Sequence, residues 1–129
     1  MVVKNLVQTI PYARFLGISV ERSSSGLVFV LPFRDQLVGN ANLPAIHGGV
    51  IGAFLELTAI LQLIDDNEGA RVARPINFGI DFLRSAGPRD TRARAEIVKL
   101  GRRVANVRAI AWQQDEHKPV AAGNGKFLL

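Results

Sequence analysis

The stretch HGGVIGAFLELTAILQLID, residues 47–65, gives the strongest indication of the fold class of this 129-residue chain. Its side chains are apolar at nearly every position, so a helix formed by it has no polar face to turn towards water and must lie deep inside the protein. The apolar run at 50–64 is shorter than the roughly 20 residues of a membrane span, and Glu56 and Gln62 interrupt it. The stretch therefore predicts a buried core helix that carries one carboxylate near its middle.

The chain on either side of this helix is predicted to form mainly strands. Ahead of it we expect two short helical pieces, a hairpin around a serine-rich turn and a loop, at 3–10, 11–17, 18–33 and 34–46. After it we expect four strands in an antiparallel meander, near 75–84, 91–100, 103–113 and 119–128. Because helices do not alternate with strands, this order favours an α+β fold in one domain, 1–129, over a parallel doubly wound sheet.

A sheet of about six strands has two faces, and one apolar helix covers only one of them. We therefore expect the sheet to curve around the helix. Its free edges and second face favour self-association, as a dimer or as a dimer of dimers.

Composition narrows the classes of function. The chain has no cysteine and its two histidines lie 70 positions apart, which argues against a disulfide framework and a metal centre. The net charge of +5 could serve nucleic acid, a membrane surface or a phosphorylated small molecule. No recognition helix, stacking aromatic pattern or basic helix face is present, so we expect neither a nucleic-acid nor a membrane partner. The N-terminal sequence has no apolar signal core, which predicts a cytoplasmic protein.

Five blocks of sequence carry a resemblance to a known family. They are IPYARFLGI at 10–18, HGG at 47–49 with Glu56 nine positions after His47, IDFLRSAGPRD at 80–90, KLGRRVANVRAIAW at 99–112, and VAAGNGKFLL at 120–129. In this order they resemble the hotdog-fold acyl-CoA thioesterases of the phenylacetic acid degradation type. The resemblance implies a curved antiparallel sheet around a central helix, and hydrolysis of an acyl-CoA thioester without a cofactor, at a site shared by two subunits.

The resemblance also implies roles for single residues. The backbone N–H of Gly48 polarises the thioester carbonyl, and Glu56 of the partner chain attacks it or activates water. A side-chain amide in the preceding loop often assists in the family. This chain departs from that pattern, because the position fifteen before Glu56 is Ala41, with Asn40 and Asn42 on either side. Either asparagine could take the role.

The residues around Glu56 support a function independently of the resemblance. The side chains three and four positions away are Gly52, Ala53, Ala59 and Ile60, so no cation on the same helix face neutralises the carboxylate. An exposed position or an ion pair with a distant arginine is the structural alternative. Burying an unpaired carboxylate costs several kcal/mol, a cost most plausible where the group is used. We therefore predict Glu56 to be catalytic, as nucleophile or as general base.

The start of the helix offers further candidates. Gly48 and Gly49 place bare N–H groups at the positive end of the helix dipole, where an oxyanion could bind, although tight packing is the alternative use of glycine. For His47 we favour a structural or positioning role over acid/base catalysis. Thr58 could orient water, or could bond a carbonyl one turn back, as threonine in a helix usually does.

Arginines cluster in the second half of the chain. Most fit a solvated sheet face, but arginine binds phosphate through two parallel hydrogen bonds, and CoA has an anionic nucleotide end. The candidates at strand ends and turns, where the resemblance places CoA contacts, are Arg84, Arg89, Arg102 and Arg103. The predicted function is therefore acyl-CoA hydrolysis. The alternatives are a non-catalytic acyl-CoA or lipid-binding module and a hydratase of the same fold, which would need an aspartate and histidine pair at a spacing not found here.

Overall fold

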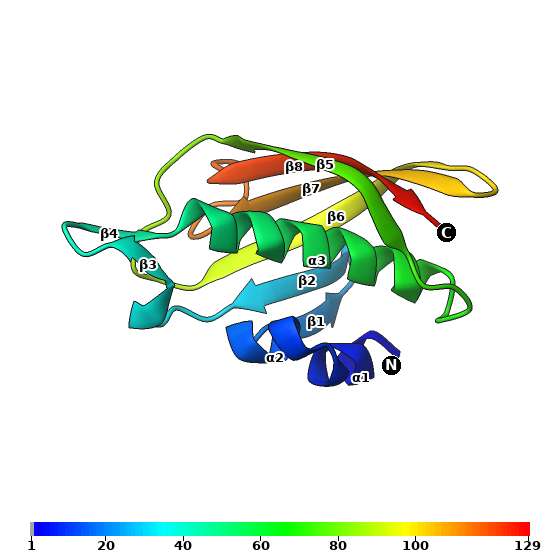
Figure 1. Cartoon of the computed structure of the whole chain (residues 1–129), viewed down its shortest axis with the longest axis horizontal. Coiled ribbons are helices and arrows are strands. Elements are labelled where there is room, and N and C mark those ends of the chain that lie inside the picture. The colour runs from blue at the N-terminus through cyan, green and yellow to red at the C-terminus, as the bar shows by residue number, and fades with distance from the viewer. Residues whose placement is uncertain (1) are drawn as a thin grey trace.

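The computed structural model describes residues 2–129 and shows a curved antiparallel sheet that wraps around a long helix (Figure 1). The helices are α1 (Val2–Thr9), α2 (Pro11–Leu16), the 3₁₀ turn η1 (Asp35–Leu37) and α3 (Gly48–Asp66). The strands are β1 (Ser19–Ser23), β2 (Gly26–Leu31), β3 (Val38–Asn40), β4 (Leu43–Ile46), β5 (Arg74–Phe82), β6 (Thr91–Leu100), β7 (Val104–Trp112) and β8 (Ala121–Leu128). Six strands form the main sheet in the order β1-β2-β6-β7-β8-β5.

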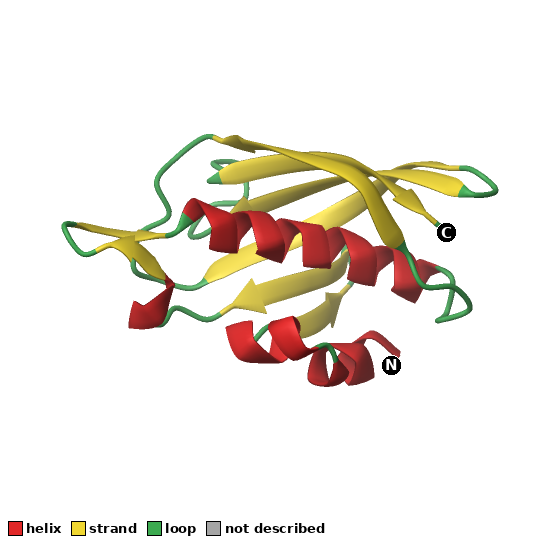
Figure 2. Cartoon of the chain, in the orientation of Figure 1, coloured by secondary structure: helices red, strands yellow, loops and turns green. Residues whose placement is uncertain are grey.

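The N-terminal elements follow the predicted pattern. Pro11 stands in the first turn of α2, where its missing N–H is not needed. Gly17 ends the helix in the left-handed region, at φ 73°, and its N–H donates to the carbonyl of Arg14. The predicted hairpin is β1–β2, paired from Ser19 with Val30 to Ser23 with Gly26. Both helices lie beside this hairpin, at one edge of the sheet (Figure 2).

The core fills the space between α3 and the concave face of the sheet. On β2 the inward residues are Leu27, Phe29 and Leu31, all buried. On β6, β7 and β8 the face under α3 consists largely of small residues, which lets the helix lie close to the strands. The buried alanines are Ala93, Ala105, Ala109, Ala111 and Ala121.

The central helix carries apolar side chains almost all round, as predicted. Phe54, Leu55 and Leu61 are fully buried against the sheet and the N-terminal helices. By length and composition α3 is also long and apolar enough to cross a membrane, a property that core helices of globular proteins share, and half of its most apolar window is buried within this fold.

The predicted four-strand meander is wrong in one respect. Only β6, β7 and β8 follow one another, whereas β5 crosses to the far edge and pairs with β8. The strand pattern shows which segments are extended but not which strand each one pairs with. The side chains of β5 and β8 are complementary in shape, because the Phe78 ring of β5 occupies the space left free by Gly123 and Gly125 of β8.

The predicted loop at 34–46 is also more ordered than expected. It contains η1 and the two-stranded hairpin β3–β4, in which Val38 pairs with Ile46. The turn between these strands is held by Asn40, whose Oδ1 accepts a hydrogen bond from the N–H of Asn42 at 2.9 Å. Strands of three and four residues are too short to show a period, which explains why the sequence pattern missed them.

The fit of Phe78 onto β8 gives a prediction about stability. A Cβ at Gly125 would lie 2.5 Å from the backbone oxygen of Asn77, so Gly125→Ala should lower the free energy of unfolding by about 1–3 kcal/mol. Denaturant unfolding measures this difference. Gly87→Ala is the matched control, because a Cβ there meets its nearest neighbour at an ordinary 3.9 Å. Equal stability of the two variants would show that the contact between β5 and β8 is not tight.

Candidate active site

The first turn of α3 leaves one backbone donor free. His47 precedes the helix, and its Nδ1 accepts a hydrogen bond from the N–H of Gly49 at 2.9 Å. The carbonyl of His47 accepts from Val50 and from Ile51, at 3.0 and 3.3 Å. Within residues 2–129 no acceptor is recorded for the N–H of Gly48. This donor points out of the positive end of the helix dipole and is available to an anionic or carbonyl oxygen.

Glycines around His47 fix this arrangement. A Cβ at Gly39 would lie 2.6 Å from Cδ2 of His47, so the imidazole rests directly on the backbone of β3. A Cβ at Gly49 would lie 3.0 Å from Nδ1 and Cε1 of the same ring. A glycine is needed at position 49 because the His47 ring, which accepts a hydrogen bond from its N–H, packs directly against it. These contacts give His47 a structural place at the start of α3, and a role in positioning substrate stays a prediction.

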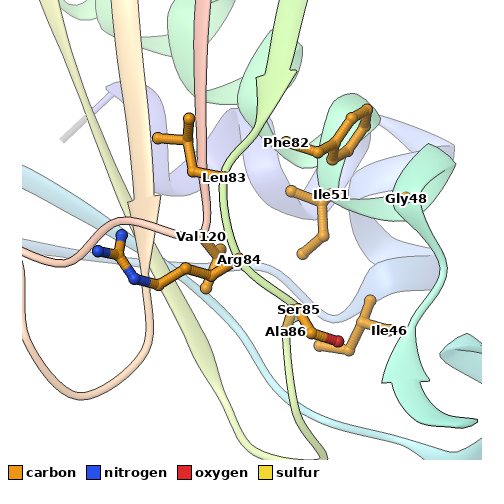
Figure 3. A pocket seen from close by; sticks show the side chains of 9 residues that line it. All are labelled: Ile46, Gly48, Ile51, Phe82, Leu83, Arg84, Ser85, Ala86 and Val120. Carbon is orange, nitrogen blue, oxygen red and sulfur yellow. The ribbon is translucent and has the colours of Figure 1, made fainter.

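A cavity of about 390 Å³ opens beside Gly48 (Figure 3). Its walls come from β4, α3, the end of β5 and the segment that follows β5. The lining residues are Ile46, Gly48, Ile51, Phe82, Leu83, Arg84, Ser85, Ala86 and Val120. The surface next to Gly48 is apolar, while the Arg84 side chain extends to the opposite side in Figure 3. The cavity therefore combines an apolar wall, a free N–H donor and a cation at its far side.

The structure separates the four candidate arginines into two pairs. Arg84 lines the cavity, and its guanidinium donates to the carbonyl of Pro119 at 2.8 Å. Arg89 is exposed on the same connection between β5 and β6.

Arg102 and Arg103 lie on the β6–β7 turn, at the other end of the molecule (Figure 1). They line a separate hollow of about 690 Å³ together with Lys99 and Lys126. The 19 residues of α3 span about 28 Å, so these two arginines do not reach Gly48 of their own chain.

The two candidate asparagines also differ in position. Asn40 lines a hollow of about 310 Å³ whose walls include His47 and Gly48, whereas Asn42 does not line it. The Oδ1 atom of Asn40 accepts a hydrogen bond in the β3–β4 turn, and no acceptor is recorded for its Nδ2 among the residues that the structure describes. Asn40 is therefore the amide that the fold brings to Gly48.

Glu56 lies two turns along α3 from Gly48. Its side chain is half-buried, so the burial expected from the sequence is only partly reached within one chain. The reason is its helix face, shared with Gly49, Ala53 and Ile60, which the sheet does not cover. Among the residues described, no ion pair or hydrogen bond engages its carboxylate, and the arginine pair considered as an alternative is not formed. The recorded ion pairs are Arg22–Asp65, Arg92–Glu21 and Arg94–Glu116.

The hydroxyl of Thr58 makes a hydrogen bond within α3. It is buried and donates to the carbonyl of Phe54 at 2.8 Å. This is the bond to a carbonyl one turn back that the sequence already allowed for Thr58, and a contact of Thr58 with substrate or water stays a prediction. In the part of the chain that the structure describes, no group of three histidine, cysteine or acidic side chains is placed to hold a metal ion.

Comparison with known proteins places these features in a family context. Residues 43–120 match the model of the thioesterase superfamily. The medium/long-chain acyl-CoA thioesterase YigI of Escherichia coli (strain K12) is 25% identical over 138 residues, covering 95% of this chain and 88% of that protein. A crystal structure of a protein from Chromobacterium violaceum is 37% identical, with a TM-score of 0.80 over 99% of this chain and 89% of the other. The PaaI protein of the Escherichia coli phenylacetic acid degradation operon shares the fold, with a TM-score of 0.81, 20% identity and coverage of 96% and 87%.

Proposed function

Because this chain belongs to the thioesterase superfamily and is a thioester hydrolase, we propose that its substrate is an acyl-CoA, cleaved to the free acid and CoA. The observation that carries the proposal is the N–H of Gly48, which has no recorded acceptor within residues 2–129 and lies at the edge of a cavity with apolar side chains next to it. Arg84 and Arg89 stand at the same end of the molecule, where they can meet the anionic nucleotide of CoA. The relative named as a medium/long-chain acyl-CoA thioesterase supports the same substrate class.

The proposed reaction uses one donor and one carboxylate. The thioester oxygen accepts a hydrogen bond from Gly48, which stabilises the negative charge that develops when the carbonyl carbon is attacked. Glu56 of a second subunit either removes a proton from the attacking water or attacks directly to form an anhydride that water then cleaves. The C–S bond breaks, the thiolate leaves, and the proton from water returns to it. Both routes consume one water and yield one acid and one thiol.

Asn40 is proposed to assist through its Nδ2 donor, by holding the thioester oxygen or the attacking water. Asn40→Ala should lower kcat about 10-fold or more, since one amide donor at a developing oxyanion contributes at least this much. Steady-state hydrolysis of one acyl-CoA measures the loss. Asn42→Ala is the matched control, because Asn42 lies on the same turn but does not line the hollow beside Gly48. Equal losses in the two variants would contradict the role given to Asn40.

The second subunit is proposed to join along β5. This strand is an edge of the sheet, and most of its residues are exposed. Pro75 and Ile76 are exposed apolar residues there, Ile76 at 54%. A long exposed edge with apolar side chains is a template for pairing with another chain, and antiparallel pairing about a twofold axis gives a dimer. The same assembly can then double to a dimer of dimers.

Gly48 and Glu56 are eight residues apart on one helix, or about 12 Å, so one thioester carbonyl cannot contact both within a chain. Mixing two inactive variants tests whether the site is shared. Glu56→Gln and Gly48→Pro chains, co-refolded in equal amounts, should recover about a quarter of the wild-type rate. Half of the dimers are then mixed, and each holds one intact site. No recovery, with mixed dimers confirmed by mass spectrometry, would place the site within one chain.

Thiol release from a panel of acyl-CoAs tests the substrate class. We expect release for acyl groups without charge, measured with a thiol reagent at saturating substrate. A protein that binds acyl-CoA in calorimetry but releases no thiol from any member of the panel would be the non-catalytic binding module instead.

A further inference from the structure

Phe82 occupies an unusual position at the end of β5. The inward face of this strand carries Phe78 and Ile80, which pack partly buried against the core. Phe82 follows in the same alternation as the last residue of β5, where it pairs with Ala121 of β8. Its side chain is 59% exposed, although phenylalanine is among the side chains that gain most from burial.

The ring of Phe82 lies directly on Gly48. A Cβ at Gly48 would be 3.3 Å from Cε1 and 3.4 Å from Cζ of the ring. Ring and glycine thus form adjacent parts of the wall of the 390 Å³ cavity (Figure 3). The one free N–H of the first turn of α3 therefore has a large, uncovered aromatic surface beside it.

We propose that Phe82 is a positioning residue for hydrolysis at Gly48, an inference that rests on the proposed function. Its ring forms the wall against which the thioester group lies, holding the carbonyl oxygen on the N–H of Gly48 and keeping water from competing for that hydrogen bond. The ring offers no partner to a charged group. The position thus favours acyl groups that are uncharged near the carbonyl.

Removal of the ring gives the first test. Phe82→Ala should lower kcat/KM for hexanoyl-CoA roughly 10- to 100-fold, because a carbonyl displaced by about 1 Å loses that much. Phe82→Tyr, which keeps the ring, should stay within about threefold of wild type. Phe15→Ala is the matched control, since Phe15 on α2 is equally exposed, at 58%, but does not line the cavity. Thermal melting of each variant separates a loss of activity from a loss of fold.

A double-mutant cycle gives the second test. Gly48→Ala keeps the N–H but adds a Cβ that presses on the ring, so removing the ring should relieve part of the damage. The double variant Gly48→Ala/Phe82→Ala should exceed the product of the two single-variant activities by about fivefold or more. This coupling depends on contact between the two residues and would not arise from a general loss of stability.

The outcomes separate this inference from the proposed function. An active wild type with Phe82→Ala within threefold of it, or with losses that multiply in the double variant, overturns the role of Phe82 and leaves the thioesterase proposal standing. A folded wild type that is silent on every acyl-CoA overturns both.

Discussion

The Glu56→Gln variant is expected to release thiol from acyl-CoA about 100 to 10,000 times more slowly than the wild-type protein. Glutamine keeps the size and shape of the side chain but can neither attack a carbonyl carbon nor accept a proton from water, and a general base contributes a factor of this order. The measurement is kcat at saturating substrate. The dissociation constant for the acyl-CoA should change little, because the role proposed for Glu56 lies in the reaction and not in binding.

The environment of Glu56 makes this variant a clean test. Its carboxylate has no recorded ion pair or hydrogen bond within residues 2–129, so the substitution leaves no partner of this chain unsatisfied. Glu96→Gln is the matched control, because Glu96 is an exposed carboxylate on β6 outside the candidate site. If Glu56→Gln kept more than a tenth of the wild-type kcat, the catalytic role of this carboxylate would be excluded.

The Gly48→Pro variant is expected to lose about 100- to 1,000-fold in kcat, the usual effect of removing one oxyanion donor. Proline removes the backbone N–H and nothing else that the helix needs. Gly48 is the first residue of α3, where proline is favoured, and His47 before it has the extended conformation, φ −56° and ψ 133°, that a residue preceding proline requires. The fold should therefore survive the loss of the donor.

Gly48→Ala is the control for the Cβ that both substitutions add at position 48. Both substitutions place a Cβ 3.3 Å from the ring of Phe82, but only proline removes the N–H. The ratio of the two kcat values then reports the loss of the N–H together with the Cγ and Cδ atoms that proline adds. Equal losses would show that contact with Phe82, and not the N–H, explains the need for glycine.

Much of the fold follows from the sequence. The apolar helix at 48–66, the β1–β2 hairpin and the extended segments after the helix are all found close to their expected bounds. The α+β hotdog fold and the membership of the thioesterase superfamily are confirmed, and the PaaI protein of the phenylacetic acid degradation operon shares this fold. These features depend on local periodicity and on motifs read within single segments. The pairing of β5 with β8 depends instead on the fit of one ring against two glycines far along the chain, which a local pattern does not contain.

The candidate site was predictable to a similar degree. The sequence indicated Gly48, His47 and Glu56 through the HGG motif and the lone carboxylate, and the structure adds the cap that leaves Gly48 free. The position of the Phe82 ring on Gly48 could not be read from the sequence, although Phe82 continues the inward alternation of Phe78. Which arginines and which asparagine lie near Gly48 could not be read from spacing, because the answer depends on the ends of the sheet at which the turns meet.

A last consequence concerns α3, because this one helix supplies buried core side chains, the N–H of Gly48 and the carboxylate of Glu56. Leu55 is fully buried and stands directly beside Glu56 in the chain. Phe54 on the same turn is buried as completely. A core substitution that displaces this turn of the helix therefore also displaces the carboxylate of Glu56. Stability and turnover are thus tied in a single helix. Given the role proposed for Glu56, substitutions that refill the interior around this turn to raise thermostability are expected to lower the rate of hydrolysis.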